Sequence, residues 1–196
     1  MYPDIYRVMR ICVAATSLLA SLPVGAQNLL QNPGFATSLD PWEPFGGFGQ
    51  TTVWSSFDAA NDPNSGSAFG TIPADSSFRV PPYASQCVVI EPNTTYVYGG
   101  KAFMPSATTS PDATSFADVE FYPNTGCFGN NDLFQFAPHV STHDAWMQIL
   151  DVATTLPSDL SVRINMYVYA PTGITMQSYF DDMFLMPDAI FRSGFE

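Results

Sequence analysis

Two carboxylates, Asp118 and Glu120, are separated by one residue in the segment FADVEFY, a spacing that allows them to act on one ligand. Side chains alternate between the two faces of a strand, so both carboxylates lie on the same face. Paired carboxylates serve as acid and base in glycoside hydrolysis, and they also accept hydrogen bonds from sugar hydroxyls. Nothing else in the sequence indicates a deep catalytic cleft, so we expect binding without catalysis.

Two further predicted strands carry side chains suited to the same ligand. In SVRINMYVY one face is apolar and the other is polar and aromatic, and TYVYGGKAFM contributes a lysine. If the three strands are neighbours, they form a shallow platform on which sugar rings stack and hydroxyls bond. The candidate sugar-binding residues are Lys101, Asp118, Glu120, Tyr122, Arg163, Asn165 and Tyr167. The periodicity fits an ordinary solvated sheet face equally well.

A second acidic pair, Asp181 and Asp182, interrupts the apolar strand SYFDDMFLM. Alternation predicts that Asp181 shares a face with Met183, and that Asp182 shares the other with Phe180 and Phe184. One aspartate therefore points toward apolar neighbours, and an unpaired buried charge is costly. We expect a partner that neutralises it.

The two histidines of the chain, His139 and His143, have a spacing that binds zinc when both lie on one face of a helix. The segment HVSTHD has no clear helical pattern, so we expect a surface loop. The chain contains no nucleophile-elbow or phosphate-loop motif.

The elements that must position these residues are strands, because helical patterns are almost absent. Short alternating runs lie between turn residues, as in all-β sandwiches and barrels. The predicted strands are residues 51–57, 67–72, 86–90, 95–104, 116–122, 146–153, 161–169 and 179–186. About eight strands in one domain predict an antiparallel β-sandwich jelly roll.

The N-terminal 26 residues predict a secretory signal peptide: Arg7 and Arg10 precede a short apolar run, and Val24-Gly25-Ala26 fits a cleavage site. The predicted domain spans residues 27–188, followed by a short tail at 189–196. We therefore expect a secreted or extracellular protein, periplasmic or on the outer surface, with no membrane insertion.

Charge narrows the range of partners. The chain has 18 acidic residues against six basic ones, and a formal net charge of −12. Such a surface repels phosphate backbones and anionic lipids, so we expect no nucleic-acid partner. It also leaves few cations to pair with buried carboxylates.

Cysteine usage agrees with export. Cys12 lies in the predicted signal peptide, so Cys87 and Cys127 are the natural disulfide pair in an oxidising compartment. A reactive thiol is the less favoured alternative.

Several segments in chain order suggest a family. They are NLLQNPGFATSLDPW at 28–42, NSGSAFG at 64–70, QCVVIEPNTTYVYGGKAFM at 86–104, residues 146–150, and YFDDMFL at 179–185. Together they resemble jelly-roll carbohydrate-binding modules of the galactose-binding-like fold, the cellulose- and xylan-binding type of families four, nine and twenty-two. The resemblance implies a non-catalytic domain that binds a poly- or oligosaccharide, with Trp42 and Trp146 in its core.

The resemblance also implies a structural calcium ion, because the first acidic residue of such a pair helps to hold calcium in these modules. Carried over, Asp181 is the best ligand, with backbone oxygens near Asn32 and Gly34. The sequence departs from the pattern at Ala36, where the modules have a glutamate ligand. The alternatives for Asp181 are capping by loop amides or a salt bridge.

The tail AIFRSGFE resembles a C-terminal signature of exported proteins from some Gram-negative bacteria, which implies a bacterial origin. A second function stays open, namely an extracellular structural or adhesion domain that uses the same sheet face against a protein partner, with no sugar ligand.

Overall fold

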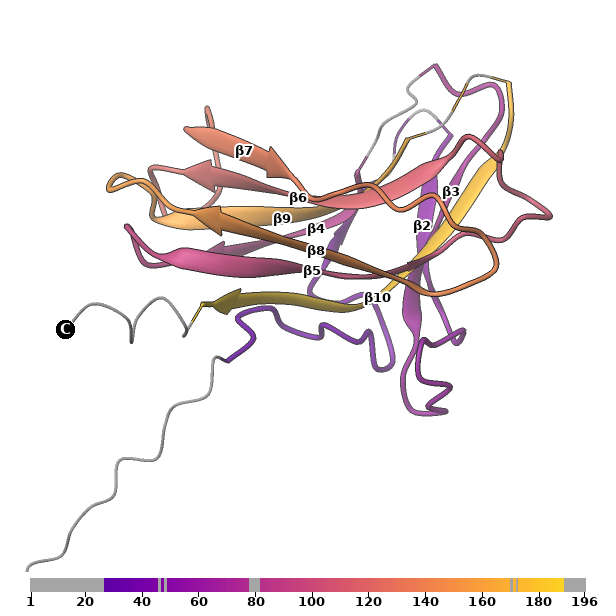
Figure 1. Ribbon diagram of the computed structural model, residues 1–196, viewed down its shortest axis with the longest axis horizontal. Helices are drawn as coiled ribbons and strands as arrows, with labels where there is room; N and C mark the ends of the chain where they lie inside the picture. The colour runs from indigo at the N-terminus through magenta and orange to yellow at the C-terminus, as the bar shows by residue number, and fades with distance from the viewer. Residues whose placement is uncertain are drawn as a thin grey trace, which may run out of the picture.

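The computed structural model describes residues 27–45, 47, 49–77, 82–169, 171 and 173–188, and there the chain forms a sandwich of two five-stranded antiparallel sheets (Figure 1). The predicted signal peptide and the tail at 189–196 lie outside these residues. Sheet A has the order β1 (Glu43–Pro44), β4 (Pro82–Val89), β9 (Ser161–Tyr169), β6 (Thr114–Tyr122), β7 (Leu133–Phe136). Sheet B has the order β2 (Thr51–Ser55), β3 (Ser67–Ile72), β10 (Met176–Pro187), β5 (Thr95–Phe103), β8 (Met147–Thr154).

The predicted all-β sandwich is confirmed, and each predicted strand corresponds to an observed one. The sequence did not predict β1 and β7, which have two and four residues. Runs this short do not show a clear alternation. Among the described residues, no helix is long and apolar enough to cross a membrane.

The core lies between the sheets and follows the alternation of the sequence. The apolar face of β9, from Val162 to Val168, is fully buried, as are Val119 and Phe121 of β6. Tyr98 of β5 is also fully buried and contributes to this core from sheet B. Because these residues point inward, the intervening residues of β6 and β9 must point outward.

Strand β10 departs from simple alternation at the two aspartates. The register with β5 shifts between Asp181 and Phe184, and Asp182 has a φ of 47°. A bulge of this kind adds a residue to one strand, so the pattern of faces changes there. Phe180 is therefore buried in the core together with Met183, and its predicted place on the face of Asp182 was wrong.

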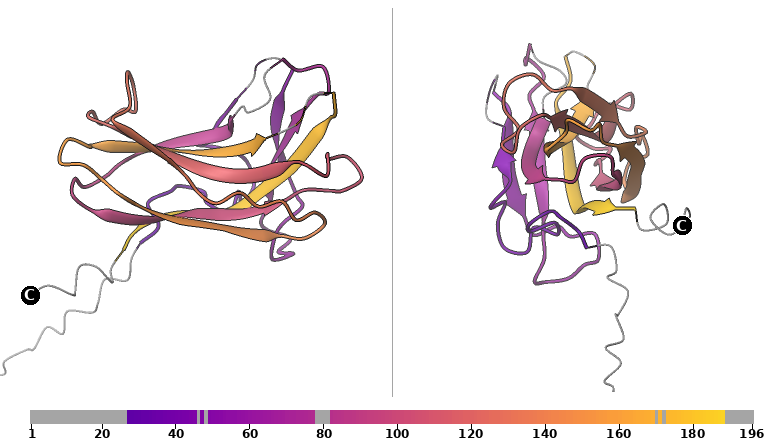
Figure 2. Two further views of the ribbon diagram at one scale, coloured as in Figure 1. Left: turned by 45° about the horizontal axis from the view of Figure 1, so that its top comes forward. Right: turned by 90° about the vertical axis from the view of Figure 1, so that its left-hand side faces the viewer.

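The two ends of the described domain lie side by side (Figures 1 and 2). The amide of Leu29 donates a hydrogen bond of 2.9 Å to the carbonyl of Leu185. The side chain of Asn28 adds bonds to the backbone of Met183 and Leu185. The opening segment is thereby attached to the last strand.

Candidate functional site

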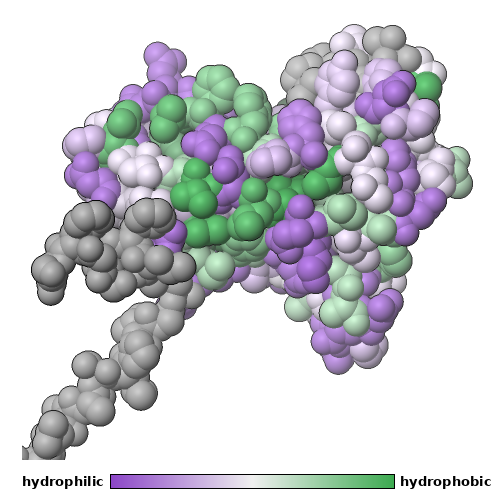
Figure 3. Space-filling model, in the orientation of Figure 1, coloured by the Kyte–Doolittle hydropathy of each residue, from purple (hydrophilic) through white to green (hydrophobic). Residues whose placement is uncertain are grey.

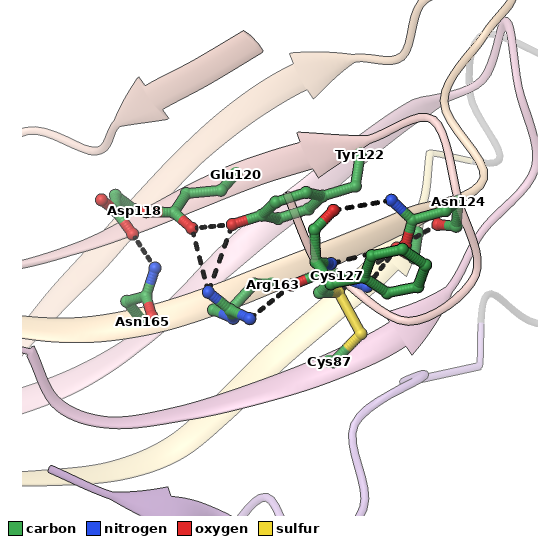
Figure 4. A network of polar contacts seen from close by, with 10 residues as sticks. Cys87, Asp118, Glu120, Tyr122, Asn124, Cys127, Arg163 and Asn165 are labelled. Atoms are coloured by element: carbon green, nitrogen blue, oxygen red, sulfur yellow. Dashed lines mark hydrogen bonds and ion pairs between the residues drawn. A yellow bond between two sulfur atoms is a disulfide. The ribbon is translucent and has the colours of Figure 1, made fainter. Parts of the chain in front are cut away.

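All the predicted sugar-binding residues except Lys101 lie together on the outer face of sheet A. Figure 4 shows five of them: Asp118, Glu120, Tyr122, Arg163 and Asn165. Strands β6 and β9 are direct neighbours, so Asp118 is paired with Asn165 and Glu120 with Arg163. Tyr167 continues the same face of β9, opposite Phe116. Strand β7 borders β6 on its other edge, so β9, β6 and β7 together supply one surface.

Hydrogen bonds connect the polar residues of this face. Asn165 donates to Asp118 Oδ1 at 2.7 Å, and the Tyr122 hydroxyl donates to Glu120 Oε2. Arg163 Nη1 lies 3.6 Å from the same Glu120 oxygen and 3.2 Å from the Tyr122 hydroxyl. Its Nη2 donates to the backbone carbonyl of Cys127. The guanidinium charge of Arg163 is thus already engaged within the protein.

A hollow of about 350 Å³ opens on this face. Its lining residues are Asp118, Glu120, Asn131, Phe134, Phe136 and Tyr167. The sequence analysis missed the two phenylalanines, which β7 contributes and which are 56% and 49% exposed. The signal was their spacing in the short segment LFQF, which puts both rings on one face of a strand. Asn131 carried no comparable signal.

A row of stacked rings borders the hollow. The ring of Tyr167 is nearly parallel to that of Phe116, with centroids 5.3 Å apart. Phe116 in turn stacks on His139 at 4.1 Å. His139 does lie in a loop, as expected, but it packs against the candidate site. The rings of Tyr167 and Phe116 hold each other in position, which limits the entropy lost when a ligand stacks on them.

Lys101 lies on β5 of sheet B, so its predicted place among the sugar-binding residues is corrected. Its Nζ is 2.8 Å from Asp182 Oδ2. Alternation along a strand gives the face on which a residue lies, but it does not say to which sheet the strand belongs.

The predicted disulfide between Cys87 and Cys127 is present. Cys87 lies on β4 opposite Arg163, and Cys127 lies in the loop between β6 and β7. Because the carbonyl of Cys127 accepts a hydrogen bond from Arg163, the disulfide fixes one end of the polar network.

Asp181 is fully buried, and it accepts hydrogen bonds from one loop amide and from the amide of the next residue of β10. Its Oδ2 accepts a 2.9 Å hydrogen bond from the amide of Ala59, and its Oδ1 accepts one of 2.7 Å from the amide of Asp182. Burial nevertheless raises the pKa of Asp181 to about 7. The structure therefore shows the amide alternative, while Lys101 pairs with the neighbouring Asp182.

The predicted calcium ligands are only partly brought together. Gly34 lies beside Asp181, because a Cβ at this position would be 3.9 Å from Asp181 Oδ1. The carbonyl of Asn32, by contrast, accepts hydrogen bonds from the Trp42 indole and the Phe35 amide. Within the described ranges no three acidic, histidine or cysteine residues form a group that could hold a metal. These residues do not assemble the six to eight oxygens of a calcium site, so the ion stays a prediction from the resemblance.

Sheet B carries its own aromatic cluster on its outer side. The interacting rings are those of Phe57, Phe69, Phe103, Trp146 and Tyr179. The predicted core position of Trp146 was therefore wrong, since its ring stacks at 5.4 Å on Phe57, which is 38% exposed. Trp42 is 3% exposed and does belong to the core.

The buried carboxyl of Asp118 leads to a prediction for stability. Burial raises its pKa to about 7, although the bond from Asn165 opposes this. Because the pKa of Asp118 is higher in the folded state, the contribution of its protonated carboxyl to folding stability is complete below the unfolded-state pKa of about 4. This contribution is lost as the pH rises through about 7. We expect Asp118→Asn to be more stable than the wild type by about 2–4 kcal/mol at about pH 8, and to show no gain at about pH 4.

Thermal and urea unfolding at both pH values measure this difference. Asp75→Asn, at an exposed carboxylate on the turn after β3, controls for the change in charge. An Asp118→Asn protein with the pH profile of the wild type would contradict the prediction.

Comparison with known proteins points to one fold. No protein-family model matches the sequence, and no curated protein matches it. Among solved structures, the CBM22-1 xylan-binding domain from Paenibacillus barcinonensis is similar, with 14% identity, a TM-score of 0.57, and coverage of 83% of this chain and 95% of that chain. The module TmCBM61, in complex with β-1,4-galactotriose, has 15% identity and a TM-score of 0.53, covering 83% and 99%.

This chain has the fold of jelly-roll carbohydrate-binding modules. The resemblance predicted from the sequence segments is thus confirmed at the level of fold. The enzymatically active domain of Bacteriophage CBA120 tailspike protein 4 is also similar, with 16% identity and a TM-score of 0.60 over 82% of this chain. There the chain spans only 21% of the larger protein. The carbohydrate-binding-module fold therefore occurs both as a separate module and as part of an enzyme.

Proposed function

We propose that this protein is a secreted, non-catalytic domain that binds a poly- or oligosaccharide on the outer face of sheet A. The observation that carries the proposal is the hollow lined by two carboxylates, an amide and three aromatic rings. These are the groups that bind sugars, since rings stack on the apolar faces of a pyranose and polar groups bond its hydroxyls. The likeness in fold to the xylan- and galactotriose-binding modules supports it.

Each part of the face has a role in this proposal. Phe134 and Phe136 are exposed and offer surfaces for sugar rings, while Tyr167 stacks from the opposite strand. Asp118 and Glu120 accept hydrogen bonds from hydroxyls. Arg163, engaged by Glu120 and Cys127, holds the carboxylate in place rather than contacting the ligand.

A panel of plant and bacterial polysaccharides tests the proposal. We expect the folded mature protein to be retarded in affinity gels that contain its ligand, and to give a saturable isotherm with the matching oligosaccharide. We expect no product to appear after prolonged incubation, because the domain is proposed to be non-catalytic. Release of reducing ends would overturn the non-catalytic part, and a folded protein that binds no glycan would overturn the proposal.

The same panel, repeated with EDTA, tests the calcium prediction separately. The amides of Ala59 and Asp182 donate to the two carboxylate oxygens of Asp181, so the geometry supports binding that survives EDTA. Loss of binding or of thermal stability in EDTA, with recovery on adding calcium, would instead support the ion that the resemblance implies.

A second candidate function rests on the outer face of sheet B. An apolar stripe there is formed by Val97, Leu150, Val152, Phe184 and Met186. Leu150 and Val152 are 52% and 41% exposed. Figure 3 shows apolar surface across the middle of the molecule, where β8 and β10 lie in Figure 1. Exposed stripes of this kind favour protein partners, so a failed glycan panel would favour an extracellular structural or adhesion domain.

A further inference from the structure

We infer that the hollow on sheet A accepts a glycan that carries free amino groups, such as a polymer of glucosamine. This inference rests on the proposed sugar-binding function and names the class of sugar. It follows from the carboxylates, the rings and the absence of a free cation among the described residues that line the hollow.

Each of the two carboxylates of the hollow keeps one oxygen to which no residue in the described part of the chain donates. Asp118 is 3% exposed, and its Oδ1 accepts the bond from Asn165, whereas no described residue donates to its Oδ2. In Glu120, the Tyr122 hydroxyl and Arg163 both approach Oε2, and no donor from the described ranges reaches Oε1. A buried carboxylate with an open oxygen favours a donor, and a charged donor most strongly.

No cation of the described chain balances these two carboxylates fully. Neither lysine nor arginine is found among the residues of the lining that the structure describes. Arg163 is nearest, but it is shared among Glu120, the Tyr122 ring and hydroxyl, and the carbonyl of Cys127. One guanidinium faces two carboxylates, so the hollow has an excess of negative charge. Burial raises the pKa of Asp118 to about 7, which agrees with a carboxylate that lacks a sufficient counter-charge.

The aromatic residues complete a site for an ammonium group. Phe134, Phe136 and Tyr167 line the same hollow as the carboxylates. A cation is attracted to the face of an aromatic ring, and the same face stacks on a sugar. An amino sugar uses both interactions at once, because its amine and its apolar ring face belong to one residue. A uronic acid would place like charges together, which disfavours binding.

Matched ligand pairs test the inference independently of the proposed function. The first pair is a fully deacetylated glucosamine oligomer and its fully N-acetylated counterpart of equal length. The second is a galacturonic acid oligomer and its methyl ester. Calorimetry at about pH 7, where a substantial share of Asp118 is ionised and a bound ammonium group favours its charged form, should show the free amine binding about tenfold more tightly than the acetylated form. The galacturonic acid oligomer should bind more weakly than its ester.

Two isosteric variants test whether the carboxylates of Asp118 and Glu120 cause the preference for the free amine. Asp118→Asn keeps an oxygen to accept the bond from Asn165, and Glu120→Gln keeps an oxygen for Tyr122. Each should lower the affinity for the free-amine oligomer about threefold more than it lowers the affinity for the acetylated oligomer, so the preference for the amine falls. Asp75→Asn, with the same change in charge at an exposed turn after β3, should keep the preference. Circular dichroism and melting temperatures confirm that each variant is folded.

The outcomes distinguish the inferred preference for amino sugars from the proposed binding of sugars in general. Equal affinity for the free and acetylated amines, or tighter binding of the galacturonic acid oligomer than of its ester, would overturn the inference while leaving sugar binding intact. An amine preference of undiminished size in both carboxylate variants would also overturn it. Failure of every glycan to bind would overturn the proposed function and the inference with it.

Discussion

A protein with Cys87→Ser and Cys127→Ser is expected to be about 4 kcal/mol less stable than the oxidised wild type. The disulfide closes a segment of 40 residues, and cross-linking that length removes about this much free energy from the unfolded ensemble. The bond also connects the loop after β6 to strand β4. Hydrogen bonds attach the same loop to β9: the amide and sulfur of Cys127 contact the hydroxyl of Ser161, and Arg163 donates to the carbonyl of Cys127.

Urea unfolding of the double variant measures the loss, which corresponds to a fall in melting temperature of about 10 °C for a domain of this size. The wild type with a reducing agent should show the same fall. Phe128→Ala, at a side chain that is 68% exposed beside Cys127, is the control for changing the loop without breaking the cross-link. Equal stability of the oxidised wild type and the double variant would refute the prediction.

Tyr167→Ala should weaken glycan binding about thirtyfold or more. Its ring lines the hollow and is held by stacking on Phe116, so it is a rigid, half-buried aromatic residue in the centre of the proposed site. Aromatic residues in such central positions typically contribute about 2 kcal/mol or more when they are removed. Tyr167→Phe keeps the stacking surface and should retain most of the affinity.

Calorimetry with the best ligand of the glycan panel measures this loss. Leu150→Ala removes an exposed apolar side chain on sheet B and should leave the affinity unchanged. Unaltered binding by a folded Tyr167→Ala protein would show that the sugar lies elsewhere. Loss of binding in Leu150→Ala but not in Tyr167→Ala would move the ligand to the apolar stripe of sheet B.

The sequence determined the fold class and most of the outward-facing residues of the candidate site. In β9 the alternation of Val162, Ile164, Met166 and Val168 with polar residues set the orientation of Arg163, Asn165 and Tyr167. The two cysteines that remain after the predicted signal peptide were enough to identify the disulfide. These features could be predicted from the sequence because the alternation of faces follows from local strand geometry. The disulfide follows from the number of cysteines.

Tertiary structure alone decided which strands are neighbours. Lys101 has the same kind of alternation as Arg163, yet β5 joins sheet B and carries it to Asp182. Phe134 and Phe136 enter the site because β7 pairs with β6, although β7 has only four residues. The bulge in β10, likewise, moved Phe180 to the core. The pairing of strands depends on contacts between separate segments of the chain. The local pattern of side chains in one strand does not identify the strand beside it in the sheet.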